Sequence, residues 1–304
     1  MQSPFELLQF LQVPGMGPVH CRAAIAALGS ARTVLEASEE ELAVLPGWGR
    51  SFARVTHRYL HTERDALERF AEAQLRAATT AGVTLVSLWD PAYPSALLDI
   101  HDPPCLLFVR GELMREDRAA IALVGSRDAT PQGRLRAASL ATAAIRAGLS
   151  VVSGLARGID TVAHQTALRV SGRTLAVVGS GLDVPYPPEN APLAARIAAQ
   201  GAVISEFPMG TRPDRRNFPR RNRLISGLSL GTIVVESALQ GGGMITARCA
   251  LDQGREVFAI PGTPGNGASA GGNTLIREGR AKLIESFDDV LVEIAPLMRR
   301  ALGG

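Results

Sequence analysis

The spacing of the apolar positions changes near residue 80. Before that point, apolar residues recur with a helical period in short stretches, such as Phe5 to Leu11 and His20 to Leu28, which glycine and proline interrupt. After it, short continuous apolar runs alternate with alanine-rich helical stretches. The pattern predicts a small all-α domain over residues 1–75 and an α/β domain over residues 81–304.

The apolar runs of the second domain are predicted strands. They are continuously apolar, as strands covered by helices on both faces of a sheet require. Their alternation with helices predicts a doubly wound, mostly parallel, Rossmann-like sheet. The strands are expected at Val83–Leu88, Cys105–Val109, Ile121–Val124, Ser150–Val152, Leu175–Val178, Ala202–Ile204, Thr232–Val235 and Val257–Ile260.

The first domain contains one kind of turn twice. Val13-Pro-Gly-Met-Gly17 and Leu45-Pro-Gly-Trp-Gly49 suggest a duplicated helix-hairpin-helix or a sterile-alpha-motif-like bundle. Such hairpins can present backbone N–H groups to phosphates. However, residues 1–80 hold 8 arginines against 9 acids. This balance favours a small docking bundle over a scaffold for duplex DNA.

Composition narrows the class of protein. The net charge is +3, and Lys282 is the single lysine among 32 basic residues, which excludes a P-loop and leaves one position for a Schiff-base lysine. Three cysteines lie far apart in sequence, without histidines at ligand spacing. We therefore expect a cytoplasmic protein with no metal and no cofactor, and we find neither a signal peptide nor an apolar run long enough to span a bilayer.

Glycine and polar residues follow nearly every predicted strand, where parallel sheets bind their ligands. Gly125-Ser126-Arg127 leads into a helix, and its backbone N–H groups and arginine suit a phosphate. Gly241-Gly242-Gly243 opens another helix and admits a ligand close to the backbone. Arg157 and Asp160 begin a third helix, in which Asp160 as an N-cap and His164 as a packed residue are the simpler interpretation.

Residues 212–223 form the most unusual stretch. Six arginines occupy twelve positions, with Asp214 as the one acid and Phe218 among them. Arginines follow a phosphate backbone, and an aromatic ring offers a stacking face to an unpaired base. The stretch predicts a loop that binds single-stranded nucleic acid or polyphosphate. Its arginines are Arg212, Arg215, Arg216, Arg220, Arg221 and Arg223.

The sequence contains no catalytic constellation. Gly179-Ser-Gly181 begins like a dinucleotide fingerprint but lacks its third glycine, and prolines follow it. Glu206 and Glu236 end strands and could bind a ribose or a metal, but neither has a partner histidine or cysteine. An enzyme is therefore disfavoured.

Together these motifs resemble the DNA-processing protein A (DprA/Smf) family over residues 85–285. The resemblance implies a cytoplasmic homodimer without catalysis. Such a protein binds and protects single-stranded DNA, and it loads the RecA recombinase past single-strand-binding protein during natural transformation, competence and DNA recombination. The resemblance rests on Val124–Arg127, Ser153–Asp160 with Ala163-His164, Gly181-Leu-Asp183, Tyr186-Pro187, Asn190, Ser205-Glu206, Phe218–Arg223, Ile245–Ala247, Val257–Gly262 and Asn273–Ile276.

The resemblance also implies site residues. In place of a loop often written Ser-Gly-Ser, this chain has Gly241–Gly243, so hydroxyl contacts are lost while backbone contacts stay available. Many members continue into a winged-helix domain, and this chain ends at Gly304 before one would begin. A weaker transfer places dimer contacts at Leu275, Ile276 and Leu283. The expected DNA contacts are Gly125, Ser126, Arg127, Arg157, Arg215, Phe218, Arg221, Asn222, Arg223, Gly241, Gly242 and Gly243.

The alternative is a nucleotide phosphoribohydrolase of the related Rossmann-like superfamily, or a nucleotide-binding protein. Those enzymes carry a glutamate on the helix after the glycine-rich loop. Here Arg248, Cys249 and Ala250 follow Gly241–Ala247, and the nearest acid is Asp252, so the missing glutamate disfavours catalysis.

Overall fold

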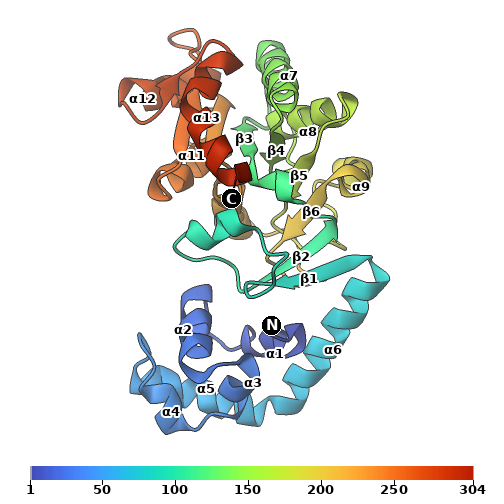
Figure 1. Ribbon diagram of the computed structural model, residues 1–304, viewed down its shortest axis with the longest axis vertical. Helices are drawn as coiled ribbons and strands as arrows, with labels where there is room; N and C mark the ends of the chain where they lie inside the picture. The colour runs from blue at the N-terminus through green and yellow to red at the C-terminus, as the bar shows by residue number, and fades with distance from the viewer. Residues whose placement is uncertain (1, 304) are drawn as a thin grey trace. The chain divides into compact units, whose positions relative to one another are not determined.

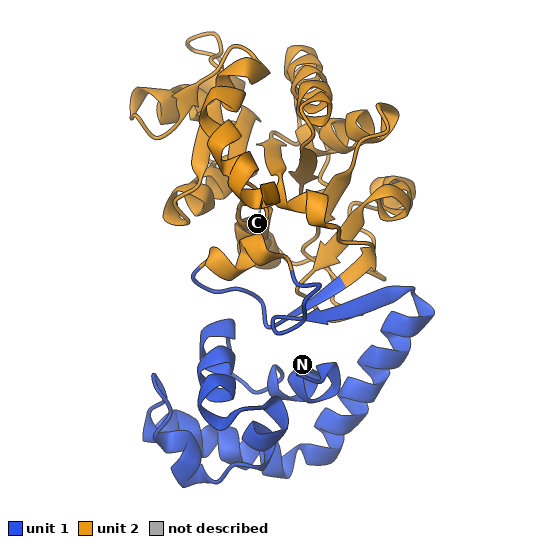
Figure 2. Cartoon of the chain, in the orientation of Figure 1, with its two compact units in different colours: residues 1–93, 101–108 blue, residues 94–100, 109–304 orange. Residues whose placement is uncertain are grey.

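A computed structural model describes residues 2–303 and divides the chain into two compact units (Figure 1, Figure 2). Unit 1 comprises residues 1–93 and 101–108, and unit 2 comprises residues 94–100 and 109–304. These bounds differ from the predicted domains, because the first strand follows the last helix of unit 1 after a two-residue turn and belongs with that helix.

Unit 1 is mainly helical and repeats one turn. The N–H of Met16 donates to the carbonyl of Val13 (2.9 Å), and the N–H of Trp48 donates to that of Leu45 (3.0 Å). In both turns the glycine after proline has a φ near +80°, a conformation that glycine adopts without strain. The elements are α1 (Pro4–Phe10), α2 (Pro18–Leu28), α3 (Ala31–Glu36), α4 (Glu39–Ala43), α5 (Arg50–Thr62), α6 (Arg64–Thr80), β1 (Val83–Ser87) and the start of β2 (Leu106–Gly111).

Two of the three cysteines, which are far apart in sequence, are neighbours in unit 1. Cys21 on α2 and Cys105 before β2 are both buried. A hydrogen bond with Cys105, together with burial, raises the pKa of the Cys21 thiol. The thiol of Cys105 also donates to the carbonyl of Pro18. These thiols therefore pack as small apolar groups in the core of unit 1.

Unit 2 contains a parallel sheet of doubly wound topology, which confirms the expected fold class. Its strands lie in the order β2-β6-β5-β4-β3-β7-β8-β9, and the pairs from β6 to β9 are parallel. The strand order reverses at β3, whose neighbours are β4 and β7. The strands are β3 (Ala120–Gly125), β4 (Ser150–Ser153), β5 (Thr174–Val177), β6 (Ala202–Ser205), β7 (Gly231–Glu236), β8 (Glu256–Ala259) and β9 (Lys282–Leu283).

Helices cover the sheet because its strands are apolar on both faces. Ile121 and Leu123 of β3 and Ile233 of β7 pack in one buried cluster with helices α7, α8 and α13. Helix α7 begins with Pro131 after an N-cap, Thr130, whose hydroxyl accepts the N–H of Gly133. The helices of unit 2 are α7 (Pro131–Arg146), α8 (Ile159–Arg169), α9 (Ala191–Gln200), α10 (Asn217–Gly227), α11 (Gly242–Asp252), α12 (Ala270–Arg277) and α13 (Phe287–Gly303).

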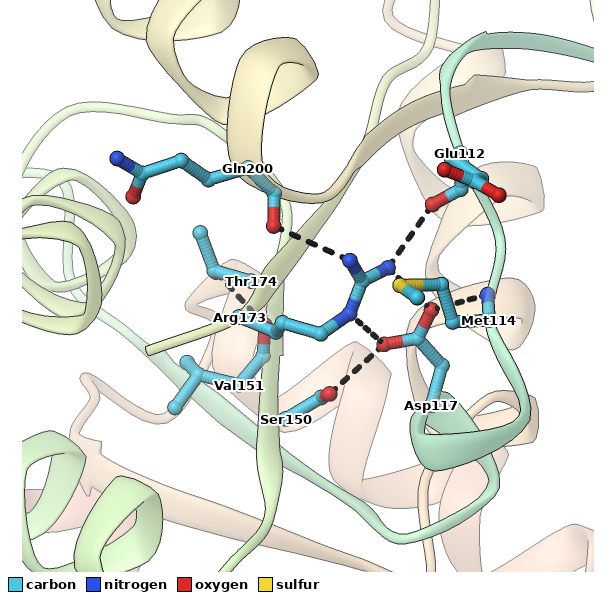
Figure 3. Close-up of polar contacts among 8 residues, drawn as sticks. All are labelled: Glu112, Met114, Asp117, Ser150, Val151, Arg173, Thr174 and Gln200. Atoms are coloured by element: carbon cyan, nitrogen blue, oxygen red, sulfur yellow. Dashed lines mark hydrogen bonds and ion pairs between the residues drawn. The ribbon is translucent and has the colours of Figure 1, made fainter. Parts of the chain in front are cut away.

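A closed network joins the amino ends of the strands (Figure 3). The guanidinium of Arg173, just before β5, binds both carboxylate oxygens of Asp117 at 3.0 and 2.7 Å. It also donates to the carbonyls of Glu112 and Gln200. Asp117 accepts further bonds from the hydroxyl of Ser150 and the N–H of Met114. The hydrogen bond with Asp117 raises the pKa of Arg173, so this arginine is tied to the scaffold as a cation.

No helix in residues 2–303 has the length and apolar character that a membrane crossing needs.

Candidate functional site

A groove of about 630 Å³ lies at the carboxyl ends of the strands, beside the point where the strand order reverses. Ligands bind at such points in doubly wound sheets, because the loops from neighbouring strands diverge there. We call it the strand-end groove. It is lined by Val124, Gly125, Ser126, Arg127, Ala156, Asp160, Tyr186, Arg215, Phe218, Pro219, Arg221, Asn222, Ile225, Ala238, Gly241, Gly242, Gly243, Ile245 and Thr246.

The loop after β3 is fixed from both sides. The N–H of Ser126 donates to the carbonyl of Glu236 at the end of β7 (2.7 Å), and the carbonyl of Ser126 accepts the N–H of Ile159 at the start of α8. Gly158 has a φ of +73°, and a Cβ there would lie 2.1 Å from the Ser126 carbonyl oxygen. Gly158 therefore allows the start of α8 to approach the carbonyl of Ser126 closely. This contact keeps the loop, with Arg127, at the edge of the groove.

The carboxylate of Glu236 supports the same loop. Its two oxygens accept the backbone N–H and the hydroxyl of Thr130, each at 2.8 Å. Glu206, at the end of β6, binds Arg223 at 2.5 Å. Both carboxylates proposed for a ribose or a metal are thus engaged in holding the scaffold. That arrangement gives no support to the phosphoribohydrolase interpretation.

The arginine-rich stretch does not form a loop throughout, contrary to the prediction. Asn217–Gly227 is helix α10. Pro219 is compatible with this helix because it lies in the first turn, where backbone N–H groups have no partner within the helix. The helical turn places Phe218, Arg221 and Asn222 along the groove while burying the last two.

The six arginines have different environments. Arg216 pairs with Asp214 at 3.0 and 3.1 Å and holds the pKa of that carboxyl near 2. Arg223 pairs with Glu206, and the guanidinium of Arg220 lies over the ring of Phe207. Arg212 and Arg215 are both exposed, and of the two it is Arg215 that lines the groove.

Arg221 is buried beneath the groove. Its guanidinium donates to the carbonyl of Gly154 at the end of β4 (2.6 Å) and to that of Val177 at the end of β5. A Cβ at Gly154 would lie 2.5 Å from the guanidinium, so a larger residue there would displace Arg221. Burial lowers the pKa of Arg221 to about 10, against the opposing attraction of Asp160. Arg221 therefore anchors α10 to two strand ends and lies too deep for a simple phosphate contact.

Asp160 is not the N-cap that we expected. The N-cap of α8 is Gly158, and the Asp160 carboxylate accepts the N–H groups of Gly154 and Ala156 instead. Burial raises the pKa of Asp160, while Arg221 opposes that shift. The packed role expected for His164 agrees with the structure, because His164 is fully buried and its Nδ1 lies 2.7 Å from the hydroxyl of Thr174.

An aromatic and cationic cluster forms one wall of the groove. The Arg127 guanidinium lies 5.3 Å from the centre of the Phe218 ring, and the Tyr186 ring lies 5.5 Å from it. Within residues 2–303, Arg127 and Arg215 form no ion pair. Positive charge at the groove is thus left available to an anion from solvent.

The second glycine loop meets the first. Gly241 is the N-cap of α11, and a Cβ at Gly243 would lie 3.4 Å from the Cα of Gly125. Gly242 has open space around it. Gly241, Gly242 and Gly243 line the groove, so the amino-terminal N–H groups of α11 border it beside the loop after β3.

Arg157 and the expected dimer residues Leu275 and Leu283 are not among the residues that line the groove. Arg157 is exposed, pairs with Glu189 and lines a small cavity next to the groove with Tyr186 and Phe218. Leu275 is buried in this chain, whereas Leu283 on β9 is 46% exposed. Of these two expected dimer residues, Leu283 has the surface that a partner could contact.

Comparison with known proteins decides the family. Residues 84–295 match the family model for DNA recombination-mediator protein A. The chain belongs to this family.

Two relatives and two solved structures illustrate the similarity. Protein Smf of Escherichia coli K12 is 50% identical over 204 residues, which are 66% of this chain and 53% of Smf. This chain thus matches about half of Smf. DNA processing protein DprA of Streptococcus pneumoniae is 44% identical over 68% of this chain and 73% of its own length. The solved structure of the Streptococcus pneumoniae protein covers 96% of this chain, and 99% of its own, with a TM-score of 0.83 and 34% identity.

The second structure is DNA processing protein A from Helicobacter pylori, solved to study its single-stranded DNA binding mode. It covers 70% of this chain and 96% of its own, with a TM-score of 0.63 and 28% identity. Both neighbours confirm the family that the sequence resembles.

Sequence reasoning missed two features of the site. Tyr186 was noted as part of a motif but not as a groove residue, because the ten residues after β5 carry no periodic signal. The buried contact of Arg221 with two strand ends was also missed. The glycine at position 154 was a visible signal, but only the fold shows which side chain needs its space.

Proposed function

We propose that this chain binds single-stranded DNA in the strand-end groove and mediates recombination by loading RecA onto that DNA during natural transformation. The observation that carries the proposal is the pair of exposed arginines, Arg127 and Arg215, which flank an aromatic cluster without an acidic partner among residues 2–303. The Helicobacter pylori relative, whose structure concerns single-stranded DNA binding, supports the same ligand.

The chemistry of the groove favours a single strand over a duplex. Phosphates fit the amino-terminal N–H groups of α11 and the two arginines. Aromatic faces are useful only to bases that have left a stack, and single strands supply such bases. In this proposal Gly125, Ser126, Arg127, Arg215, Phe218, Asn222 and Gly241–Gly243 contact the DNA, while Arg221 and Arg223 hold α10 in position. Arg157 contacts DNA at the edge of the groove.

The partner proteins belong to the same proposal. We place a homodimer contact at Ile276 and Leu283, and we assign cytoplasmic RecA and single-strand-binding protein as partners. The exposed apolar side chain of Leu283 supports the first assignment. Replacing Leu283 by Glu should shift the sedimentation coefficient toward that of the monomer. An unchanged coefficient contradicts this contact.

A binding titration across a salt series tests the proposed ligand. We expect tight binding to a dT oligomer and much weaker binding to a blunt duplex of equal length. The logarithm of the affinity should fall linearly with that of the salt concentration, by about 0.7 for each phosphate neutralised. Equal affinity for both ligands contradicts the assignment. RecA loading is tested separately, by RecA ATPase activity on DNA covered with single-strand-binding protein.

A further inference from the structure

Unit 1 is nearly neutral as a whole, but its charges are unevenly distributed. Helix α5 contains three arginines and two histidines and no acidic residue. On α3 and α6, in contrast, Arg32, Arg64 and Arg76 each pair with a glutamate four residues away. The balance of 8 arginines and 9 acids in residues 1–80 therefore hides one helix whose charged side chains are all cationic.

The arginines of α5 lie on one face of the helix. Arg50, Arg54 and Arg58 are spaced by four residues, so they follow one another along about 12 Å of the helix axis. All three are exposed, whereas Ala53 and Leu60 on the other face are buried. The helix thus presents a row of guanidinium groups to the solvent.

Most of this positive charge is not engaged elsewhere. Among residues 2–303, the guanidinium groups of Arg50 and Arg58 form no ion pair. Arg54 pairs with Glu39 of α4 at 3.1 Å, but its side chain is 62% exposed. An exposed pair of this kind contributes little to stability, so a phosphate can replace the carboxylate.

Backbone donors lie at the amino end of the same row. The two glycine turns of unit 1 end at Gly17 and Gly49, the N-caps of α2 and α5, and neither helix has a side-chain cap among the described residues. The turns pack together, since a Cβ at Gly15 would lie 3.2 Å from the ring of Phe52, whose centre is 5.0 Å from that of His20. The first-turn N–H groups of both helices, which have no partner within a helix, therefore lie near each other.

The chemistry of this surface suits a duplex better than a single strand. Guanidinium and N–H groups bind phosphates, which a duplex carries on its outside. The exposed residues of α5 include no Phe, Tyr or Trp, so they offer no large ring on which an unpaired base could stack. Cations without such rings bind a sugar-phosphate backbone whatever its sequence.

We infer that the arginine row of α5, with the amino ends of α2 and α5, is a second DNA-binding surface, which takes the phosphate backbone of a duplex. We call it the α5 surface. The inference goes beyond the proposed function, which concerns a single strand in the strand-end groove. A chain with both surfaces binds the duplex parts as well as the single-stranded parts of a recombination intermediate.

An experiment with two ligands separates the two surfaces. The ligands are a blunt DNA duplex and a dT oligomer of equal length. Arg50→Ala/Arg58→Ala should weaken duplex binding at low salt about tenfold and lower the salt slope by about 2, because two phosphate contacts are lost. Its binding to the dT oligomer should change less than twofold. Arg215→Ala should weaken binding to the dT oligomer and change duplex binding less than twofold.

Two further variants serve as controls. Arg69→Ala/Arg76→Ala removes the same charge from exposed positions of α6 and should bind the duplex like the wild type. Arg50→Lys/Arg58→Lys keeps the charge and should retain most of the duplex affinity. Thermal unfolding shows whether each variant is folded, and the single variants Arg50→Ala and Arg58→Ala replace the pair if it is not.

The inference is overturned if the wild type does not bind the duplex at low salt, or if the α5 variants bind it like the wild type. It is also overturned if the α6 control loses as much duplex affinity as the α5 variants, or if those variants lose the same factor on both ligands. The proposed function stands in each case, as long as the wild type binds the dT oligomer. If dT binding is absent, the proposed function fails, and the duplex titrations still decide the α5 surface.

Discussion

The two ends of the parallel sheet use the same residue type for opposite purposes. At the amino end, the side chain of Arg173 is 23% exposed, and its guanidinium donates hydrogen bonds to Asp117 and to two carbonyls. At the carboxyl end, Arg127 and Arg215 are exposed and form no ion pair within residues 2–303. What differs is whether a carboxylate is available to pair with the arginine. Glu206, Glu236 and Asp160 lie near the carboxyl end, but their contacts are to the scaffold.

An arginine stays available to a ligand where the fold places no carboxylate beside it. A paired and half-buried guanidinium is costly to separate from its carboxylate, so it stabilises the fold only while the pair is intact. An unpaired guanidinium at a rim contributes little to stability and keeps its donors for a phosphate. Variants at the two ends should therefore affect different properties.

The largest effect is expected at the amino end. Arg173→Ala leaves the carboxylate of Asp117, which is 8% exposed, without its cationic partner. The free energy of unfolding should fall by about 3 kcal/mol, as for other buried ion pairs that lose one member. Affinity for a dT oligomer should not change. Urea unfolding followed by circular dichroism measures the free energy of unfolding. Fluorescence anisotropy measures the affinity for the dT oligomer.

Arg169→Ala is the matched control for this variant, because Arg169 is an exposed arginine at the end of α8. It should change the free energy of unfolding by less than about 0.5 kcal/mol. The division of roles between the two ends fails if both variants unfold alike, or if Arg173→Ala weakens DNA binding as much as a change at Arg127.

The next effect concerns His164, buried beneath the carboxyl end. Burial, with the charge of Arg221, lowers the pKa of His164 from 6.5 to about 3. Below pH 6.5 the imidazole of His164 is protonated in the unfolded chain but stays neutral in the folded chain. The free energy of unfolding therefore falls as the pH drops. The loss should be about 2 kcal/mol between pH 7 and pH 5.

Urea unfolding at pH 7 and pH 5 measures this loss, and His164→Gln should lack it. The raised pKa of Asp160 acts with the opposite sign, since the folded chain holds that proton more readily. The wild type and His164→Gln both contain Asp160, so its contribution largely cancels when their pH dependences of unfolding are subtracted. Identical pH dependence in both proteins contradicts the assignment to His164.

At the carboxyl end, Arg127→Ala and Arg215→Ala should each weaken binding to a dT oligomer by about 1–2 kcal/mol. Each should also flatten the salt dependence, because one phosphate contact is lost. Stability should stay unchanged. Arg212→Ala is the control, since Arg212 is exposed in the same segment but is not among the groove residues. Wild-type affinity in both groove variants disproves the site.

The smallest effect should come from Asp214. This carboxylate is paired with Arg216, which holds its pKa near 2, so it is ionised at neutral pH. Asp214→Asn should release Arg216 and raise affinity for DNA about twofold at low salt, with no gain at high salt. Asp252→Asn, at the far end of α11, should have no such effect. Equal gains in both variants point to net charge rather than to Arg216.

Much of the fold could be predicted from the chain because strands buried on both faces must be continuously apolar. The loop Gly125-Ser126-Arg127 was placed at a strand end because it follows the apolar run Ile121–Val124 and precedes a helical stretch. The structure of the arginine-rich segment was harder to predict. Its charge density predicted an anion site, but Asn217–Gly227 is helical, and the helix sends Arg221 inward and Arg223 to Glu206. The composition of the segment gives no information about these distant partners, so the contacts of Arg221 and Arg223 could not be predicted from it.

Three features can be read from the chain alone: the alternation of strand and helix, the glycine loops at the strand ends and the excess of arginine near Phe218. These follow from local patterns, since apolar periodicity and glycine act over a few residues. The tertiary structure decided which arginines keep their charge available. That outcome depends on distant carboxylates and carbonyls, such as Glu206, 17 positions from Arg223, and Gly154, 67 positions from Arg221. Only folding brings such groups within hydrogen-bond distance.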